Sequence, residues 1–280
     1  MLARIQNTTR PKNRISAAKI IIASCGSITP RELRPAHCFD LDAQINDTGK
    51  SHSTRKAYAN YVRWWLRWLW EEHGAQKLDG SIRSQVGVRP RNVTITPEER
   101  DALLTNAEPW LRLMLMLCED TAIRSGTAQQ LGPRQYDPAR RALTFTTKMG
   151  ERLTLPVTDA IAQLLADCDL SDPAPFIRQL WRKLHKDHAS KDDKQPHPRY
   201  NAQFVKLRHA LGITRKLTFH DLRRTAAVGM YRLTRDLREV QALLGHRSMQ
   251  STVWYLDHDL NPVQRTTLEL VKQHRKDNAA

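Results

Sequence analysis

Residues 96–99 carry the signal for the start of a helix. This signal separates the chain into two parts that we expect to fold independently. Thr96 is a good N-cap residue, Pro97 suits the first helical position, and Glu99 completes a capping box. The preceding stretch, residues 77–93, shows no apolar periodicity and combines glycine, proline and arginine. We therefore expect a basic linker over residues 77–93 and a separate domain over residues 94–280.

The part before the linker is expected to hold little regular structure. Residues 1–35 contain seven Lys or Arg and one Glu, which predicts a basic N-terminal arm, either a solvated tail or a segment that contacts phosphates. Residues 36–76 are predicted to form a reduced helical region. Its one clear helix is capped by Ser53 or Thr54 and ends near His73, with Gly74 as its stop.

Four tryptophans fall within that helix, at positions 64, 65, 68 and 70. Four rings at these positions cannot share one helix face. We therefore expect the helix to be buried on two sides or packed on a partner, with the rings in a core rather than stacked on bases.

The second part alternates helical patterns with one hairpin. Leu143 and Phe145, then Leu153 and Leu155, alternate on either side of residues 148–151, which predicts a β-hairpin. Helices are expected over residues 97–118, 158–168, 175–190, 199–210, 219–233, 236–244, 248–255 and 263–274. The predicted fold class is mostly α with a small antiparallel β-sheet (α+β).

Charge and cysteine content narrow the class of protein. Lys and Arg number 45 against 29 Asp and Glu, a net charge of +16, which favours a polyanionic partner. No apolar window is long enough for a membrane span, and no secretory signal is evident. The four cysteines form no CxxC pair, which argues for a reducing compartment and against a disulfide framework or a cysteine-rich zinc site. We expect a cytoplasmic protein, nucleoid-associated when bound to DNA.

Several short motifs place ionisable side chains at characteristic spacings. They are Thr121-Ala122-Ile123-Arg124, Thr147-Lys148, His220-Asp221-Leu222-Arg223-Arg224, Leu244-Gly245-His246-Arg247-Ser248 and, nine residues after His246, Tyr255. Each residue alone would be ordinary, a surface arginine or a core tyrosine. Their order and spacing together are much more specific than any one of these residues.

This set resembles the tyrosine recombinase (phage integrase) family over about residues 94–260. The family pattern has an Arg box, a hairpin Lys, H-x-[LM]-R, L-L-G-H and a Tyr nine residues after that His. The matching residues are Arg124, Lys148, His220, Arg223, His246 and Tyr255. The chain departs from the pattern at Ala122, where the family usually has Gly, and at Thr127, where it generally has an acid.

The chemistry of these side chains suits a phosphodiester. Arg124 and Arg223 are fork-shaped cations that can hold the non-bridging oxygens, His246 can donate a further hydrogen bond, and His220 can accept or relay the proton of Tyr255. Tyr255 is the expected nucleophile. The resemblance implies a covalent 3′-phosphotyrosine intermediate, a Holliday junction, and Lys148 as the acid for the leaving 5′-oxygen. No cofactor and no metal are expected.

The resemblance also implies the partners. They are double-stranded DNA with paired inverted half-sites and further copies of this chain, as a dimer per site or a homotetramer. The residues expected to contact DNA are Arg4, Arg10, Lys12, Arg14, Arg83, Arg89, Arg91, Arg224 and Arg247. The helix at 263–274 is expected to dock on its own domain or on a neighbouring protomer. A type IB topoisomerase and a non-catalytic DNA-binding module are the alternatives.

Overall fold

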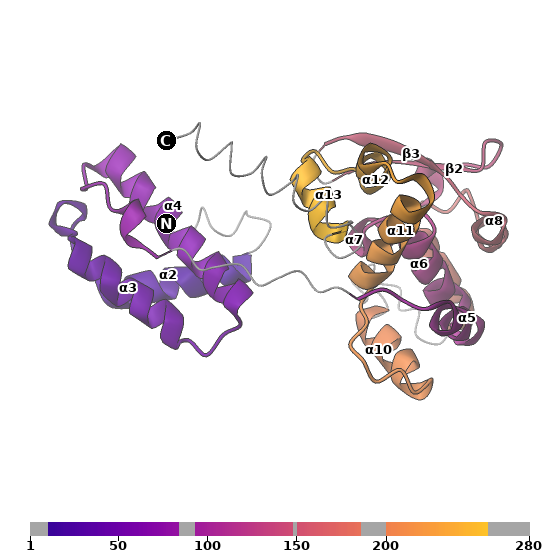
Figure 1. The fold of residues 1–280 in the computed structure, drawn as a ribbon, viewed down its shortest axis with the longest axis horizontal. Coiled ribbons are helices and arrows are strands. Elements are labelled where there is room, and N and C mark those ends of the chain that lie inside the picture. The colour runs from indigo at the N-terminus through magenta and orange to yellow at the C-terminus, as the bar shows by residue number, and fades with distance from the viewer. Residues whose placement is uncertain (1–10, 84–92, 148–149, 186–199, 257–280) are drawn as a thin grey trace. The chain divides into compact units, whose positions relative to one another are not determined.

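The structure is a computed structural model that describes residues 11–83, 93–147, 150–185 and 200–256 (Figure 1). The chain forms two compact units, Met1–Arg89 and Pro90–Ala280. No helix among the described residues is long and apolar enough to cross a membrane. The predicted helix at residues 263–274 lies outside the described residues.

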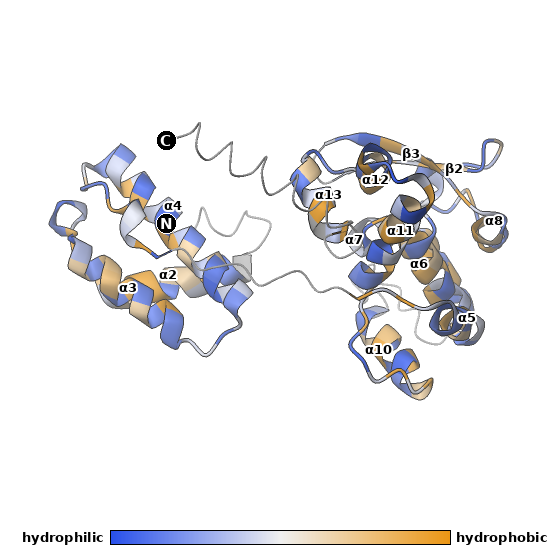
Figure 2. Cartoon of the chain, viewed as in Figure 1, coloured by the Kyte–Doolittle hydropathy of each residue, from blue (hydrophilic) through white to orange (hydrophobic). Residues whose placement is uncertain are grey.

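The first unit is a small helical bundle. Its elements are α2 (Pro11–Cys25), η1 (Pro30–Glu32), α3 (Pro35–Asp47), α4 (His52–His73) and η2 (Asp79–Ser81). Figure 2 shows hydrophobic and hydrophilic residues on each of α2, α3 and α4, as expected for helices with one buried face. Helix α4 packs against both α2 and α3. It begins at the cap Ser51, earlier than predicted, and ends at Gly74 with φ +65°, as predicted.

The solvated tail that was one alternative for the basic arm is wrong for residues 11–35, which fold as α2 and η1, whereas contact of this segment with phosphates stays a prediction. Ala17, Ala18, Ile21 and Cys25 lie on one face of α2 and are buried in the core of this unit, as is Leu33 after η1. Lys12 and Arg14 precede these buried positions in the chain and Lys19 lies among them, so the high local charge concealed a helix with one buried face.

The predicted linker also begins too early. Leu78 and Ile82 are 3% and 2% exposed and belong to the same core. The Arg63 guanidinium donates to the Ile82 carbonyl over 3.0 Å, which fixes the end of this segment to α4. The first unit therefore includes residues 77–82.

The tryptophans of α4 divide between core and surface. Trp65 is buried, whereas Trp64 and Trp70 are 52% and 41% exposed. Trp64 stacks on Tyr61, with ring centroids 5.4 Å apart, and Lys77 lies over the Trp70 ring. The expectation that the rings lie in a core therefore holds for Trp65 and is wrong for Trp64 and Trp70. The described helix buries one side, and packing of its exposed rings on a partner stays a prediction.

The second unit surrounds a central apolar helix. Its elements are α5 (Pro97–Asn106), α6 (Pro109–Glu119), α7 (Ser125–Ala128), η3 (Pro133–Gln135), β1 (Tyr136–Asp137), β2 (Ala142–Thr146), β3 (Arg152–Pro156), α8 (Asp159–Ala166), α9 (Phe176–Leu184), α10 (Tyr200–Ala210), α11 (Phe219–Thr234), α12 (Leu237–Leu244) and α13 (Met249–Leu256). Helix α6 is buried almost throughout and contacts α5, α7, α8, α9, α10 and α11. The predicted capping box at Thr96 and Glu99 is present. The helix predicted over residues 97–118 is two helices, because Pro109 starts a new one.

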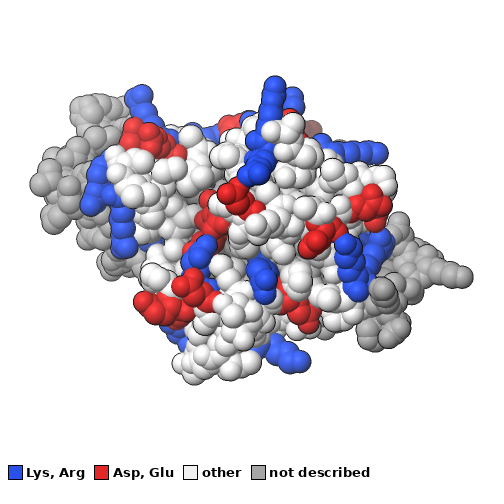
Figure 3. All heavy atoms as spheres, turned by 90° about the vertical axis from the view of Figure 1, so that its right-hand side faces the viewer, with Lys and Arg blue, Asp and Glu red and all other residues white. Residues whose placement is uncertain are grey.

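The sheet is antiparallel with strand order β1-β2-β3. The predicted hairpin is confirmed, with Leu143 opposite Leu155 and Phe145 opposite Leu153. The two-residue strand β1 was not predicted. On the face drawn in Figure 3, Lys and Arg alternate with Asp and Glu, so the positive charge of the chain forms no dominant patch there.

Candidate active site

The first turn of α11 sets two of the candidate residues in place. The Asp221 carboxylate accepts hydrogen bonds from the Thr218 backbone N–H and hydroxyl, each at 2.7 Å, and so caps the helix. His220 then lies exposed at the helix start. Arg223 lies one turn later, and only 3% of its surface is exposed.

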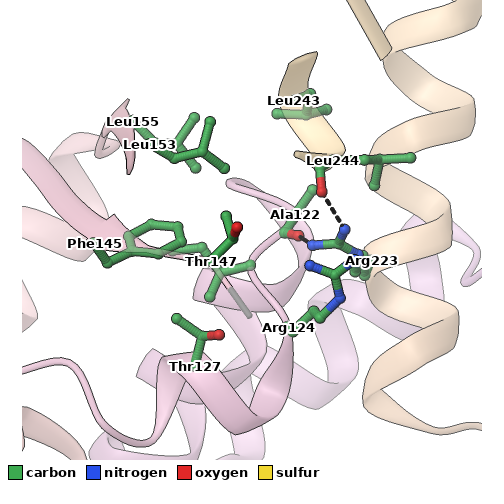
Figure 4. A pocket seen from close by; sticks show the side chains of 11 residues that line it. Ala122, Arg124, Thr127, Phe145, Thr147, Leu153, Leu155, Arg223, Leu243 and Leu244 are labelled. Atoms are coloured by element: carbon green, nitrogen blue, oxygen red, sulfur yellow. Dashed lines mark hydrogen bonds between the residues drawn. The ribbon is translucent and has the colours of Figure 1, made fainter. Parts of the chain in front are cut away.

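Backbone carbonyls from two other segments fix the Arg223 guanidinium. It donates to the carbonyl of Ala122 and, over 2.6 Å, to that of Leu244 (Figure 4). Burial and the nearby Arg124 lower the pKa of Arg223 to about 10. The group therefore remains a cation at neutral pH, and its orientation is set before any substrate arrives.

Arg124 enters the same pocket from the start of α7. Its side chain lies beside Arg223 in Figure 4, where the two guanidiniums are neighbours. Ala122 has a φ of +53°, a left-handed conformation that favours glycine, and it is fully buried. The Thr121 hydroxyl donates to the Leu117 carbonyl over 2.6 Å and ties this turn to α6. Two adjacent cations, Arg223 buried and Arg124 half-buried, form a natural site for an anion with several oxygens.

His246 follows directly after α12. Gly245 ends that helix with φ +56°, and the Gln241 amide donates to the His246 carbonyl over 2.7 Å. The His246 ring has Nδ1 3.2 Å from the Thr252 hydroxyl and Nε2 3.5 Å from Arg223 Nη2. Burial and the cations Arg223 and Arg124 lower the pKa of His246 to about 4, so the ring is neutral at pH 7.

Tyr255 on α13 faces both histidines. Its hydroxyl lies 2.8 Å from His220 Nε2, and its ring contacts the His220 and His246 rings edge-on, at centroid distances of 5.1 and 5.3 Å. Arg223 lies close enough to Tyr255 for their charges to interact. Partial removal of the His220 ring from water and the positive charge of the neighbouring Arg223 lower the pKa of His220. A neutral His220 can accept the tyrosine proton at neutral pH.

The hairpin that carries Lys148 lies against the end of α12. Lys148 itself is outside the described residues. Its flanking residues Thr147 and Glu151 pair through their backbones over 2.7 Å, and Gly150 turns the chain with φ +84°. A Cβ at Gly245 would lie 2.7 Å from Leu153 of β3, so the hairpin approaches the His246 segment closely.

The structure thus brings Arg124, His220, Arg223, His246 and Tyr255 together. The residues predicted to contact DNA differ in their surroundings, and several of them lie outside the described residues. Arg4, Arg10, Arg89, Arg91 and the Lys12 side chain lie outside the described residues. Arg14 is half-buried and Arg83 is exposed on the first unit, while Arg247 is exposed and paired with Glu151 over 3.1 Å.

Arg224 is more buried than its predicted role suggests. Only 4% of its surface is exposed, because α11 is covered by α6 on one side and by α12 and α13 on another. Arg223 is buried to the same degree, so burial alone does not decide contact with a phosphate, and the contact of Arg224 with DNA stays a prediction.

Sequence reasoning missed three contributors to the site: the carbonyls of Ala122 and Leu244, and the Thr252 hydroxyl. Backbone carbonyls carry no residue-type signal. Thr252 precedes Tyr255 by three residues and therefore shares its helix face, a spacing that could have drawn attention to it. The described residues contain no group of three His, Cys, Asp or Glu side chains placed to hold a metal ion.

Comparison with known proteins agrees with this geometry. The sequence model of the phage integrase family matches residues 94–261. Tyrosine recombinase XerC of Rhizobium meliloti is 26% identical over 247 residues, which cover 81% of this chain and 73% of the relative. XerC of Brucella suis is 32% identical over 163 residues, 54% of this chain and 49% of the relative. The chain thus spans about half to three quarters of these relatives.

Solved structures show the same fold. A lambda integrase fragment (residues 75–356), solved as a dimer on a COC′ core site, superposes with a TM-score of 0.64 at 17% identity, covering 89% of this chain and 88% of the other. The integrase of transposon Tn1549, solved with circular intermediate DNA, gives a TM-score of 0.64 at 12% identity and covers 94% of each chain. The family match spans more than half of the residues and includes the whole cluster around Tyr255, so the chain belongs to the phage integrase family of tyrosine recombinases.

Proposed function

We propose that this chain is a site-specific recombinase that cleaves and rejoins DNA through a covalent 3′-phosphotyrosine bond. The observation that carries the proposal is the position of the Tyr255 hydroxyl, 2.8 Å from Nε2 of His220 and near the buried guanidinium of Arg223. This arrangement provides a nucleophile, a base for its proton, and a cation for the group that it attacks.

In the cleavage step, His220 accepts the hydroxyl proton as the Tyr255 oxygen attacks phosphorus. The new bond joins the tyrosine oxygen to the 3′-phosphate, and the bond from phosphorus to the 5′-oxygen breaks. The departing 5′-oxygen takes up a proton, and the family resemblance assigns that donor role to Lys148. The reaction conserves the phosphodiester energy in the phosphotyrosine bond, so a 5′-hydroxyl of another strand can reverse it.

Charge develops on the non-bridging oxygens as phosphorus becomes pentacoordinate. Arg124 and Arg223 are adjacent in the pocket of Figure 4, and Arg223 is held by two carbonyls, so these cations require little rearrangement as the charge grows. His246 Nε2 lies 3.5 Å from Arg223 and can donate a further hydrogen bond to the same oxygens. Electrostatic stabilisation by preorganised donors is the main catalytic contribution that we assign to this site.

DNA is the proposed partner. The net charge of +16 favours a polyanion, and the lambda and Tn1549 integrases were each solved on DNA. We propose that this chain binds paired half-sites as a dimer per site and exchanges strands as a tetramer through a Holliday junction. Exposed Arg83 of the first unit is a candidate phosphate contact.

Strand exchange tests the proposal. Duplexes that bind the purified chain would be selected from a random pool, and two labelled copies of the selected site would be incubated with the protein. We expect four-way junctions and recombinant duplexes. Relaxation of supercoiled plasmid without junctions would indicate a topoisomerase instead. Binding without junctions, relaxation or covalent adducts would indicate a non-catalytic DNA-binding protein.

A further inference from the structure

Thr252 is a buried hydroxyl beside the site to which the reaction above assigns no role. It lies in α13, three residues before Tyr255, and none of its surface is exposed. Its hydroxyl oxygen is 3.2 Å from Nδ1 of His246. His246 is the only hydrogen-bond partner of this hydroxyl among the described residues. A neutral imidazole has one N–H and one lone pair, so this contact bears on which nitrogen holds the proton.

Two arrangements of protons are possible. In the first, Nδ1–H donates to the Thr252 oxygen, and Nε2 accepts from Arg223. The threonine proton then has no acceptor within the described residues, and the contact between Arg223 and Nε2 is long, at 3.5 Å. Arg223 Nη2 also already donates to the Leu244 carbonyl over 2.6 Å. This arrangement leaves a buried donor without a partner, which is costly.

In the second arrangement, the Thr252 hydroxyl donates to Nδ1, and the proton resides on Nε2. The threonine proton then has an acceptor, and the Nε2–H of the ring faces the same space as the Arg223 guanidinium. Because both donors point into one space, a single acceptor there, such as an oxygen of the scissile phosphate, can bind both of them.

The neighbouring cations oppose this second arrangement. Arg223 and Arg124 both act on His246, and their charge favours a lone pair at the nearer nitrogen, Nε2. Without a donor at Nδ1, the field of the two guanidiniums would move the proton from Nε2 to Nδ1. The ring would then present an acceptor to the phosphate where a donor is required.

We propose that Thr252 is a positioning residue that holds His246 in the Nε2–H tautomer and thereby makes it a donor to the scissile phosphate. The donor role rests on the proposed function, whereas the tautomer itself can be measured without DNA. Wrong-tautomer effects in other enzymes show that such control has large kinetic consequences.

The test is ¹⁵N NMR of the histidine rings in the full chain at neutral pH, with the His246 signal assigned by its loss in His246→Gln. We expect wild type to show His246 as Nε2–H. Thr252→Val keeps the shape of the side chain but removes the hydroxyl, and should give a Nδ1–H population. Thr252→Ser restores the hydroxyl and should restore Nε2–H. Ser251→Ala, at an exposed position of the same helix, should change nothing.

A wild-type His246 in the Nδ1–H form would overturn the proposal, and so would a Thr252→Val ring that stays wholly Nε2–H. If Thr252→Val does not fold, the ¹⁵N spectrum of Thr252→Ala takes its place. The wild-type spectrum alone already shows whether His246 is in the Nε2–H form. Single-turnover cleavage of a nicked, affinity-selected duplex is the second readout. Thr252→Val should cleave roughly tenfold more slowly or worse, while Thr252→Ser keeps most of the wild-type rate. If the wild type cleaves nothing, the proposed function fails, and the spectra still decide the role of Thr252.

Discussion

Replacing Gly245 with alanine should destabilise the second unit and displace the β2–β3 hairpin from the His246 segment. Gly245 has φ +56°, a conformation that costs an L-residue about 1–2 kcal/mol. An added Cβ would also lie 2.7 Å from Leu153 Cδ1 and 3.3 Å from Thr147 Cγ2. Overpacking in a core costs about 1–3 kcal/mol, and we expect the lower end here because Leu153 Cδ1 is the end of a half-buried, flexible side chain. The sum predicts a loss of about 2–3 kcal/mol.

Gly212 provides the matched control for Gly245. Its φ is +72°, and a Cβ there would meet nothing within 4 Å, so Gly212→Ala should cost only the backbone contribution, about 1–2 kcal/mol. Urea titrations read by hydrogen exchange in peptides from α11 and α12 would measure the free energy of unfolding of the second unit alone. Adding Leu153→Ala should reduce the extra cost of Gly245→Ala. Equal costs at Gly245 and Gly212, or no coupling to Leu153, would refute the close approach of hairpin and helix.

Three further outcomes follow from the site. Arg124→Ala should lower the rate of single-turnover cleavage by roughly 10²-fold, which corresponds to on the order of 3 kcal/mol, and should affect DNA binding much less. A cleavage rate near that of the wild type would show that Arg124 does not belong to the site. Because the pKa of His246 falls from 6.5 to about 4 on folding, the unfolded state binds more protons between these values. Stability should therefore decline as pH falls from about 6.5 towards 4. His246→Gln should flatten that decline in urea titrations, and an unchanged slope would argue against the buried neutral ring. Since arginines supply the charge at the site, cleavage should proceed in excess EDTA, and an absolute need for a divalent ion would contradict the mechanism.

The sequence predicted the second unit better than the first, for physical reasons. The hairpin, the capping box at Thr96 and the helix carrying His220 and Arg223 all depend on local signals that the structure retains. Helix α2 was missed because its buried face consists of small and apolar residues set among strong positive charge. The exposed Trp64 shows the reverse case, an aromatic residue that core statistics would place inside.

Within the site, the spacing of residues in the sequence identified the charged side chains. It did not predict how deeply each of them is buried or what each contacts. Arg223 and Arg224 are consecutive, so helical geometry alone points them about 100° apart and suggests that one faces outward. Both are buried because helices pack on two sides of α11, a tertiary fact that no local spacing contains. The same holds for the Ala122 and Leu244 carbonyls, which reach Arg223 from segments about 100 and 20 residues away in the chain.

The residue that becomes covalently joined to DNA identifies the nucleophile. The protein would be trapped on a nicked duplex carrying its selected site, the adduct digested, and the DNA-linked peptide sequenced by mass spectrometry. We predict one linkage, at Tyr255, and no SDS-resistant adduct with Tyr255→Phe, although that variant still binds the duplex. Tyr231 is 1% exposed and should never be labelled. An adduct at Tyr200, or at any residue in Tyr255→Phe, would contradict the assignment of the nucleophile.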